Sequence, residues 1–275
     1  MKILKAPAKV NIGLWIIGKR ADNYHNIYSY VQKISLYDKI SVKPAPILKV
    51  KTTNPEVPEN EGNIVYKAVK AFENYTGLEA NFEIVIEKNI PVGAGLGGGS
   101  SDAAAILKFL NEEFGNPLTQ EELLKIASYV GSDVPLFFKE GLTKIRGKGD
   151  IVEETGQSLE GKELFIVYPN VGTSTEEVYK KVSYEMLTKE EELSKIDSLL
   201  EDIDKFLNSV ENTLGKLAAD VYPQINEVLN TLEFLGYKGY ITGSGSAVFV
   251  IGKPSEKLET ICKVRNWKLI QAKFI

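Results

Sequence analysis

The chain has very little of the chemistry that builds disulfides and metal sites, because its 275 residues include one cysteine, Cys262, and one histidine, His25. A single cysteine excludes an intramolecular disulfide, and with only one histidine beside it the common structural zinc patterns are also excluded. This composition is typical of proteins from a reducing compartment, so we expect a cytoplasmic location.

Long hydrophobic runs are missing as well. No stretch is apolar enough for a membrane span, and the basic residues from Met1 to Lys9 are not followed by the apolar core of an export signal. The net charge of -4 gives no general attraction to nucleic acid or anionic lipid. We therefore expect a small-molecule ligand, no nucleic-acid or membrane partner, and a monomer or weak homodimer.

What is present predicts an α+β protein of two domains, since the length allows two buried cores. Val10, Ile12 and Leu14 alternate with polar residues, which predicts a strand that puts Lys9 and Asn11 on one face. Further strands are expected within 27–42, at 82–87, 134–138 and 163–168, and within 239–251 and 267–274. Helices are expected at 63–77, 103–110, 119–131, 188–206 and 224–235, and after Pro254. A polar, glycine-containing stretch at 147–161 predicts the boundary between domains at 1–158 and 159–275.

The strongest local signal is a glycine-rich segment between a predicted strand and a predicted helix. It consists of Pro91, Val92, Gly93, Ala94, Gly95, Leu96, Gly97, Gly98, Gly99, Ser100, Ser101 and Asp102. Glycines adopt positive φ angles and turn backbone amides onto an anion, and the helix that follows adds unsatisfied amides and the positive end of its dipole. The segment therefore predicts a phosphate loop, with a flexible hinge as the simpler alternative.

Other phosphate-binding motifs fit less well. No lysine followed by serine or threonine comes after the glycines, so the segment is not the common P-loop. Gly93, Gly95 and Gly98 have the spacing of a dinucleotide fingerprint, but Glu112 and Glu113, about twenty residues on, end a predicted helix instead of a strand. The catalytic-loop and metal-binding motifs of protein kinases are also missing.

Three blocks together are similar to the motifs of one enzyme family. Residues 7–14, 91–102 and 241–249, in this order and spacing, resemble the three motifs of the superfamily named after galactokinase, homoserine kinase, mevalonate kinase and phosphomevalonate kinase. Within this superfamily, residues 20–27, 35–38 and 131–135 resemble the kinases of a cytidine-diphosphate-linked polyol. Asn23, where those kinases usually have glycine, and residues 26–31 depart from their pattern.

The resemblance implies a two-domain α+β fold with a left-handed β-α-β crossover in the first domain and the active site in the cleft between the domains. It also implies that Mg·ATP phosphorylates the 2-hydroxyl of a methylerythritol moiety, a step of the non-mevalonate isoprenoid pathway. The glycine loop would then bind ATP, and Ser101 is a candidate Mg²⁺ ligand.

The resemblance also assigns catalytic roles. Asp133 matches the catalytic base, which would take the proton of the attacking hydroxyl, although an aspartate after glycine and serine is otherwise a turn former. Lys9 would hold the hydroxyl and the aspartate in register, and Asn11 would hydrogen-bond the polyol. By itself, Lys9 reads as a solvated strand residue.

The resemblance assigns further residues to the cytosine ring of the substrate, to the adenine ring of ATP and to the phosphates. Tyr24 and His25 would bind cytosine, which Tyr179 would close from the other side. Asn63 matches the adenine-side segment, although it also reads as a helix cap. Gly243, Ser244 and Gly245 would border the phosphate loop and the substrate diphosphate, although such a cluster between strands also reads as a tight turn. Lys148 would contact the substrate phosphates.

Two other classes stay open at this stage. The same fold hosts sugar-responsive regulators that bind ligands without turnover, against which the pair of Lys9 and Asp133 argues. A dinucleotide-dependent oxidoreductase would share the glycine spacing. Within the kinases, mevalonate or homoserine kinase is the alternative.

Overall fold

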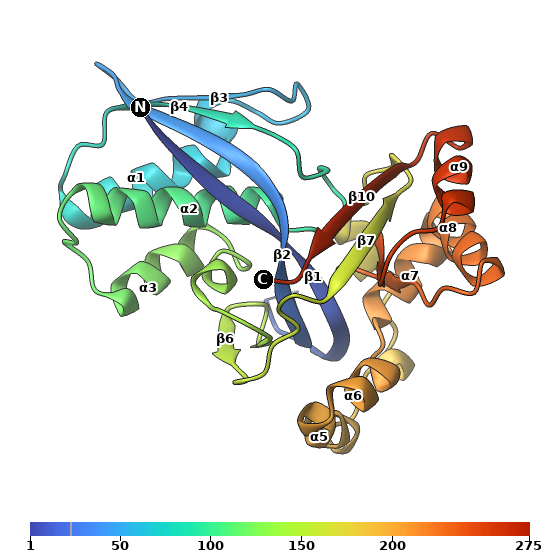
Figure 1. Cartoon of the computed structure of the whole chain (residues 1–275). Helices are drawn as coiled ribbons and strands as arrows, with labels where there is room; N and C mark the ends of the chain where they lie inside the picture. Colours follow the sequence, from blue (N-terminus) through green and yellow to red (C-terminus); the bar gives the residue numbers. More distant parts are fainter. Residues whose placement is uncertain (23) are drawn as a thin grey trace. The chain divides into compact units, whose positions relative to one another are not determined.

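The structure is a computed structural model that describes residues 1–22 and 24–275 (Figure 1). It divides into two compact units. Unit 1 contains Met1–Ala8, Leu36–Val92 and Gly97–Lys139, and unit 2 contains Lys9–Ser35, Gly93–Leu96 and Glu140–Ile275. Two long strands, β1 (Lys2–Lys19) and β2 (His25–Pro44), contribute residues to both units. Asn23, one of the departures from the family pattern, lies outside the described residues.

Unit 1 is built around a parallel β-α-β crossover. Strand β3 (Lys49–Thr52) pairs in parallel with β4 (Phe82–Glu87), and helix α1 (Ile64–Thr76) connects them. On its other side β4 pairs antiparallel with Lys39–Pro44 of β2. Helices α2 (Gly98–Glu113) and α3 (Gln120–Val130) pack against α1, and two short 3₁₀ helices, η1 (Asn60–Gly62) and η2 (Pro135–Phe138), complete the unit.

Helices α1 and α3 of unit 1 begin and end where the sequence predicts. The Asn63 side chain accepts a hydrogen bond from the Val65 amide at the start of α1, and Gly77 ends the helix with a φ of 73°. Helix α3 opens on a capping box between Thr119 and Glu122. These signals are local, so the sequence alone was sufficient to place both helices.

Unit 2 contains a four-stranded antiparallel sheet in the order β10-β7-β9-β8. Its strands are β7 (Glu163–Tyr168), β8 (Tyr240–Ile241), β9 (Val248–Ile251) and β10 (Lys268–Lys273). Side chains of α7 (Thr213–Val221), α8 (Pro223–Phe234) and α9 (Glu256–Val264) form one hydrophobic core with this sheet, in which Phe165, Val228 and Cys262 are buried.

The rest of unit 2 includes a hairpin and five short or medium helical segments. Strand β5 (Thr143–Arg146) pairs antiparallel with both β6 (Ile151–Glu154) and Ser29–Val31 of β2. The remaining helical segments are α4 (Thr175–Tyr179), η3 (Tyr184–Met186), α5 (Glu190–Ser198), η4 (Leu199–Glu201) and α6 (Ile203–Ser209). Within residues 1–22 and 24–275, no helix has the length and apolarity that crossing a membrane requires.

The predicted α+β class is confirmed, but several predicted elements differ. The strand expected at 134–138 is wrong, because Pro135–Phe138 is the 3₁₀ helix η2. A short apolar run does not distinguish a strand from a buried helical turn, and a proline fits the first helical position without losing a hydrogen bond. Helix α2 begins five residues before the predicted start at Ala103, inside the glycine-rich segment.

Several further elements were not predicted, among them the β5–β6 hairpin and helix α7. Residues 147–150, in the stretch predicted to contain the domain boundary, form the turn of the β5–β6 hairpin. Helix α7 was also missed, although Asn212 caps it by accepting from the Gly215 amide, which is the kind of signal that identified α1. The boundary after residue 158 stays a prediction.

Candidate active site

The glycine-rich segment has the backbone geometry of an anion-binding loop. The φ angles are positive at every second residue, with 65° at Gly93, 78° at Gly95 and 71° at Gly97. Alternation of left-handed residues with other conformations turns successive amides towards one side, which is the arrangement of anion-binding concavities in proteins. Three of the predicted glycines therefore occupy positions that other residues adopt only with strain.

Within unit 2, the carbonyl groups of residues 93–96 all accept hydrogen bonds from the protein. Gly93 O accepts from the Thr173 amide at 3.0 Å, and Ala94 O accepts from the Ala247 amide at 3.2 Å. The Gly95 carbonyl accepts from Lys9 Nζ at 2.8 Å and from Thr242 Oγ1 at 3.0 Å. The backbone amide of Lys9 donates to Leu96 O at 3.0 Å. This half of the loop is therefore held through its acceptors.

The amides of the same segment are left available. Among the hydrogen bonds within residues 1–22 and 24–275, none has a backbone amide of residues 93–97 as its donor. Buried or half-buried amides normally have partners, so a run of unused donors is the mark of a site for an acceptor from outside the chain.

Gly95 is required for a second reason besides its φ angle. A Cβ atom at this position would lie 2.1 Å from the Thr242 carbonyl oxygen and 3.0 Å from that of Gly245. The predicted substrate segment at 243–245 and the loop therefore contact each other backbone to backbone, as the family resemblance implies.

Lys9 and Asn11 lie on one face of β1, as predicted, and both are buried. Lys9 Nζ donates to Asn11 Oδ1 at 2.6 Å, and Asn11 Nδ2 donates to Ser29 Oγ at 2.9 Å. Thr242 joins this network, since its hydroxyl accepts from the Asn11 amide at 3.0 Å. Asn11 thus orients the Lys9 ammonium, while its contact with the polyol stays a prediction.

The predicted glycine cluster after β8 is buried within unit 2. Asn212 Nδ2 donates to the Gly243 carbonyl at 2.9 Å, and the hydroxyl of Ser244 is 2.8 Å from that of Thr175. Gly243 and Gly245 both have positive φ angles. Their roles towards the substrate stay predictions.

Four residues predicted to bind the substrate come together in two adjacent pairs. The rings of His25 and Tyr179 are stacked with their centroids 5.1 Å apart, and Lys148 Nζ lies 5.6 Å from the centroid of the Tyr24 ring. Burial, with help from the nearby Lys19 charge, lowers the pKa of His25 below its usual value. At neutral pH the imidazole is therefore neutral, with one nitrogen donating and one accepting.

The second half of the loop belongs to unit 1. Gly97 precedes α2 in a left-handed conformation. The first amide of the helix to reach a helical acceptor is that of Ser101, which donates to the Gly97 carbonyl at 3.0 Å, so the earlier helix amides have no partners within the helix. The Ser101 hydroxyl is buried and has no hydrogen-bond partner in the described part of the chain. A buried oxygen of this kind is suited to the role of Mg²⁺ ligand that was predicted for Ser101.

The two other predicted residues of unit 1 are Asn63 and Asp133. Asn63 caps α1 with its oxygen and donates from Nδ2 to the Pro58 carbonyl at 2.8 Å, so the simpler alternative is confirmed. Its adenine contact stays a prediction. Asp133 lies half-buried in the turn between α3 and η2. Its partnership with Lys9, a residue of unit 2, stays a prediction.

The sequence did not reveal one charged cluster, in which Lys88 bridges Asp38 and Asp102. Burial raises the pKa of the Asp102 carboxyl and the Asp38 charge adds to the rise, while Lys88 opposes it. Burial acts to lower the pKa of Lys88, but the two carboxylates raise it overall. In the sequence, Asp38 belongs to one of the blocks that resemble the family. Nothing in the sequence pattern links Asp38 to Lys88 or Asp102, which follow it by 50 and 64 positions.

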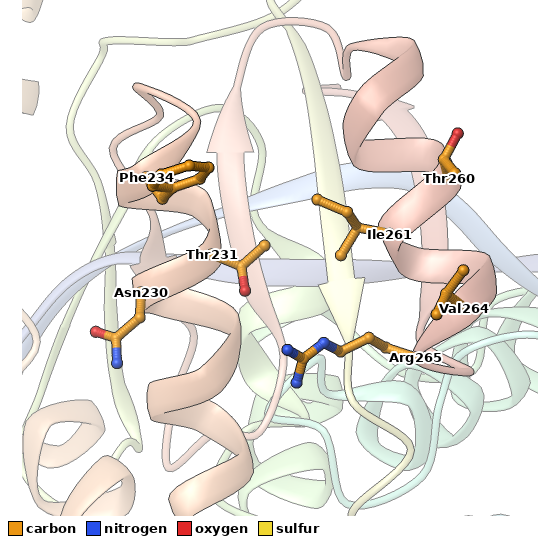
Figure 2. A pocket seen from close by; sticks show the side chains of 7 residues that line it. All are labelled: Asn230, Thr231, Phe234, Thr260, Ile261, Val264 and Arg265. Carbon is orange, nitrogen blue, oxygen red and sulfur yellow. The ribbon is translucent and has the colours of Figure 1, made fainter.

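A separate groove lies between α8 and α9 (Figure 2). It has a volume of about 420 Å³ and is lined by Asn230, Thr231, Phe234, Thr260, Ile261, Val264 and Arg265. Phe234 and Val264 are 78% and 83% exposed. None of the predicted site residues lines this groove, so it is not the site of the kinase motifs.

The comparison with known proteins begins with two family profiles. That of the GHMP kinases N terminal domain matches residues 63–141, and that of the GHMP kinases C terminal matches residues 191–266. A protein of Persephonella marina named 4-diphosphocytidyl-2-C-methyl-D-erythritol kinase is 51% identical over 271 residues, which cover 98% of each chain. The chain belongs to the GHMP kinases. A second GHMP kinase with the same name, from a Sulfurihydrogenibium species, is 45% identical over 99% of each chain.

Solved structures of GHMP kinases agree with this assignment. A crystal structure titled 4-(cytidine 5'-diphospho)-2C-methyl-D-erythritol kinase has a TM-score of 0.78 and 27% identity, with 99% of each chain covered. Mevalonate kinase from Methanococcus jannaschii has a TM-score of 0.72 at 16% identity, with 100% of this chain and 98% of that chain covered, which shows the fold alone. The predicted family and fold are therefore confirmed.

Gly95→Ala should destabilise the protein strongly, because the new methyl group would meet the Thr242 carbonyl and force a left-handed alanine. We expect a loss of roughly 3 kcal/mol in the free energy of unfolding of the unit that contains it, from strain of 1–2 kcal/mol and overlap of about the same size. Denaturant unfolding monitored by circular dichroism measures this loss.

Gly156→Ala is the matched control. Gly156 also belongs to unit 2 and has a φ of 76°, but nothing lies within 4 Å of an added Cβ atom. It should cost only the strain, about 1–2 kcal/mol. Equal losses in the two variants would contradict the tight contact between the loop and Thr242.

Proposed function

We propose that the protein transfers the γ-phosphoryl group of ATP to the 2-hydroxyl of 4-diphosphocytidyl-2-C-methyl-D-erythritol, giving the 2-phosphate and ADP in the non-mevalonate isoprenoid pathway. The observation that carries this proposal is the 51% identity to a kinase of that name along 98% of both chains. The chain's own residues supply groups for each step of the reaction.

The phosphoryl donor binds at the glycine-rich loop. In phosphoryl transfer the protein mainly positions the groups and stabilises charge on the transferred phosphoryl oxygens. The unused amides of residues 93–97 and the first amides of α2 are donors suited to those oxygens. The positive end of the α2 dipole adds about 0.3–1 kcal/mol for each favourable contact with an anion.

The acceptor hydroxyl is activated by Asp133 and positioned by Lys9. The Asp133 carboxylate takes the hydroxyl proton as the hydroxyl oxygen bonds to the γ-phosphorus, and the bond from that phosphorus to ADP breaks. The Lys9 ammonium, whose direction is set by Asn11 Oδ1 and the Gly95 carbonyl, stabilises the negative charge around the reacting oxygen.

Magnesium is the divalent ion that fits this donor set. The buried Ser101 hydroxyl, which has no partner among the described residues, would hold it together with phosphate oxygens of ATP. When bound, the ion neutralises charge on the triphosphate.

Specificity for the cytidyl group comes from Tyr24, His25 and Tyr179. A cytosine edge presents both a donor and acceptors, and a neutral imidazole presents one of each. The phenol ring of Tyr179, stacked on His25, fixes the plane of the imidazole. Lys148, whose ammonium lies 5.6 Å from the centroid of the Tyr24 ring, would supply a positive charge to the substrate diphosphate.

This set of aromatic residues separates the proposal from its nearest alternative. Mevalonate and homoserine carry no base, so they offer nothing for His25 and Tyr179 to bind. The oxidoreductase alternative loses support because Glu113 is the last residue of α2, where it cannot meet a ribose at the end of a strand. We place the enzyme in the cytoplasm, as the single cysteine suggests, and propose that it is a monomer or weak homodimer.

A substrate panel tests the proposal. The protein with Mg·ATP should release one ADP for each molecule of the cytidyl polyol diphosphate consumed, and the product should gain the mass of one phosphoryl group. Mevalonate and homoserine should give no ADP above background. Turnover of either of these in place of the cytidyl substrate would overturn the assignment.

Asp133→Asn should reduce kcat by 100-fold or more while ATP binding stays as in the parent protein. Removal of a general base costs typically 10²–10⁴-fold, and the amide has the shape of the carboxyl without its basicity. Steady-state kinetics measure the first effect and calorimetric titration with ATP the second. A variant with unchanged kcat would eliminate Asp133 as the base.

A further inference from the structure

Unit 1 contains a charged cluster that is almost completely removed from solvent. The side chains of Asp38, Lys88 and Asp102 are 0%, 4% and 3% exposed. Lys88 forms ion pairs with both carboxylates, and its distance to Asp102 Oδ2 is 2.7 Å. Burying charges costs several kcal/mol per ion, and apolar replacements are often equally stable. Stability alone is therefore a weak reason for this cluster.

Asp38 fixes the backbone at the entrance of the glycine-rich loop. Its Oδ1 accepts from the Asn89 amide at 2.6 Å and from the Ile90 amide at 2.8 Å, while its Oδ2 accepts from Lys88. These are the residues directly before Pro91, where the loop begins. A buried carboxylate with two amide donors and one ammonium donor is a firm anchor, because bonds to an ionised group are about twice as strong as neutral ones.

Lys88 connects this anchor to the exit of the loop. Its ammonium donates to Asp102, in the second turn of α2, and lies so close to the start of the helix that a Cβ atom on Gly98 would be 3.2 Å from Nζ. The same Cβ would be 3.1 Å from the Ile90 side chain. Residues on both sides of the loop are therefore held to one lysine, and all of them belong to unit 1.

The cluster also leaves two polar atoms without partners. Asp102 Oδ1 and the neighbouring Ser101 Oγ are buried and unpaired in the part of the chain that the structure describes. An unsatisfied buried polar group costs about 1–3 kcal/mol. An arrangement selected for stability would not carry this cost at the first turns of the phosphate-binding helix.

We propose that Asp38, Lys88 and Asp102 are positioning residues for the nucleotide. They act through the loop without touching the substrate, by fixing the entrance at 88–90 against the start of α2 so that the helix amides meet the phosphates of ATP. The idea deepens the proposed function and rests on it for the identity of the nucleotide. Asp38 and Lys88 are not among the predicted site residues, and Asp102 was predicted only as the last residue of the glycine-rich segment.

Asp38→Asn tests the proposal, because the amide keeps the shape and the Oδ1 acceptor but removes one charge from Lys88. Asp38 is also remote in sequence from the candidate metal ligand Ser101. We expect the Kd for ATP, measured by calorimetry with and without Mg²⁺, to rise at least tenfold. The KM for ATP should rise in parallel, while the KM for the cytidyl substrate changes less than twofold.

Asp197→Asn is the control. The Asp197 carboxylate likewise accepts from several donors, Tyr28, Tyr30 and Lys144, but it lies in unit 2 on helix α5. This variant should lose stability and bind ATP within twofold of the parent protein. An Asp38→Asn variant with the parent's Kd, or an equal loss of ATP affinity in Asp197→Asn, would overturn the positioning role.

A measurement on the unaltered protein covers the case in which Asp38→Asn does not fold. Coupling is reciprocal, so a cluster that positions the loop must itself be stabilised when the loop is occupied. Saturating ATP should slow hydrogen exchange of the Asn89 and Ile90 amides at least fivefold, and unchanged exchange would refute the proposal. The Kd measurements and the hydrogen-exchange measurement need only ATP binding. A failure to phosphorylate the cytidyl substrate would therefore reject the proposed function without deciding the positioning role.

Discussion

The site depends on how the glycine-rich loop uses its backbone. The carbonyl groups of residues 93–96 are taken by Lys9, Thr173, Thr242 and Ala247, so the loop is held firmly without using its amides. A backbone that is fixed through its acceptors and leaves its donors available is preorganised for an anion, because binding then requires no hydrogen bond of the protein to be broken. Alternating positive φ angles make this possible, and only glycine adopts them without strain.

This use of the backbone makes motifs that are far apart in the sequence dependent on one another. Lys9 holds the loop with both its amide and its ammonium, and the ammonium is the group that we propose to position the acceptor hydroxyl. Thr242 supports both Gly95 and Asn11 through one hydroxyl. If the proposed roles hold, a change at any of these residues affects nucleotide binding and catalysis together.

Much of the fold could be read from the sequence where the signals are local. Asn63 with Gly77, and Thr119 with Glu122, mark helix ends through contacts between neighbours in the chain. The strand predicted at 134–138 was wrong because the apolar residues of this run suit a buried helical turn as well as a strand. Pro135 begins that turn. Helix α7 contains a glycine in its first turn, which obscured a cap at Asn212 that was otherwise visible.

The candidate site was predictable to the extent that the family motifs carry it. The motifs correctly predicted that Lys9, residues 93–96 and the 243–245 segment lie together. The rings of His25 and Tyr179 stack directly on each other, and the predicted roles of both residues towards cytosine stay predictions. The cluster around Lys88 could not be predicted, because its contacts join residues up to 52 positions apart and depend on the register of β2 against β4. Long-range ion pairs have no periodicity that a sequence shows.

The central claim is that the amides of residues 93–97 receive the phosphates of ATP, and amide chemical shifts test it most directly. In ¹⁵N-labelled protein titrated with a non-hydrolysable ATP analogue and Mg²⁺, the largest amide shifts should belong to residues 93–100, at the loop and the start of α2. Shifts concentrated elsewhere, with these amides unmoved at saturation, would contradict the account.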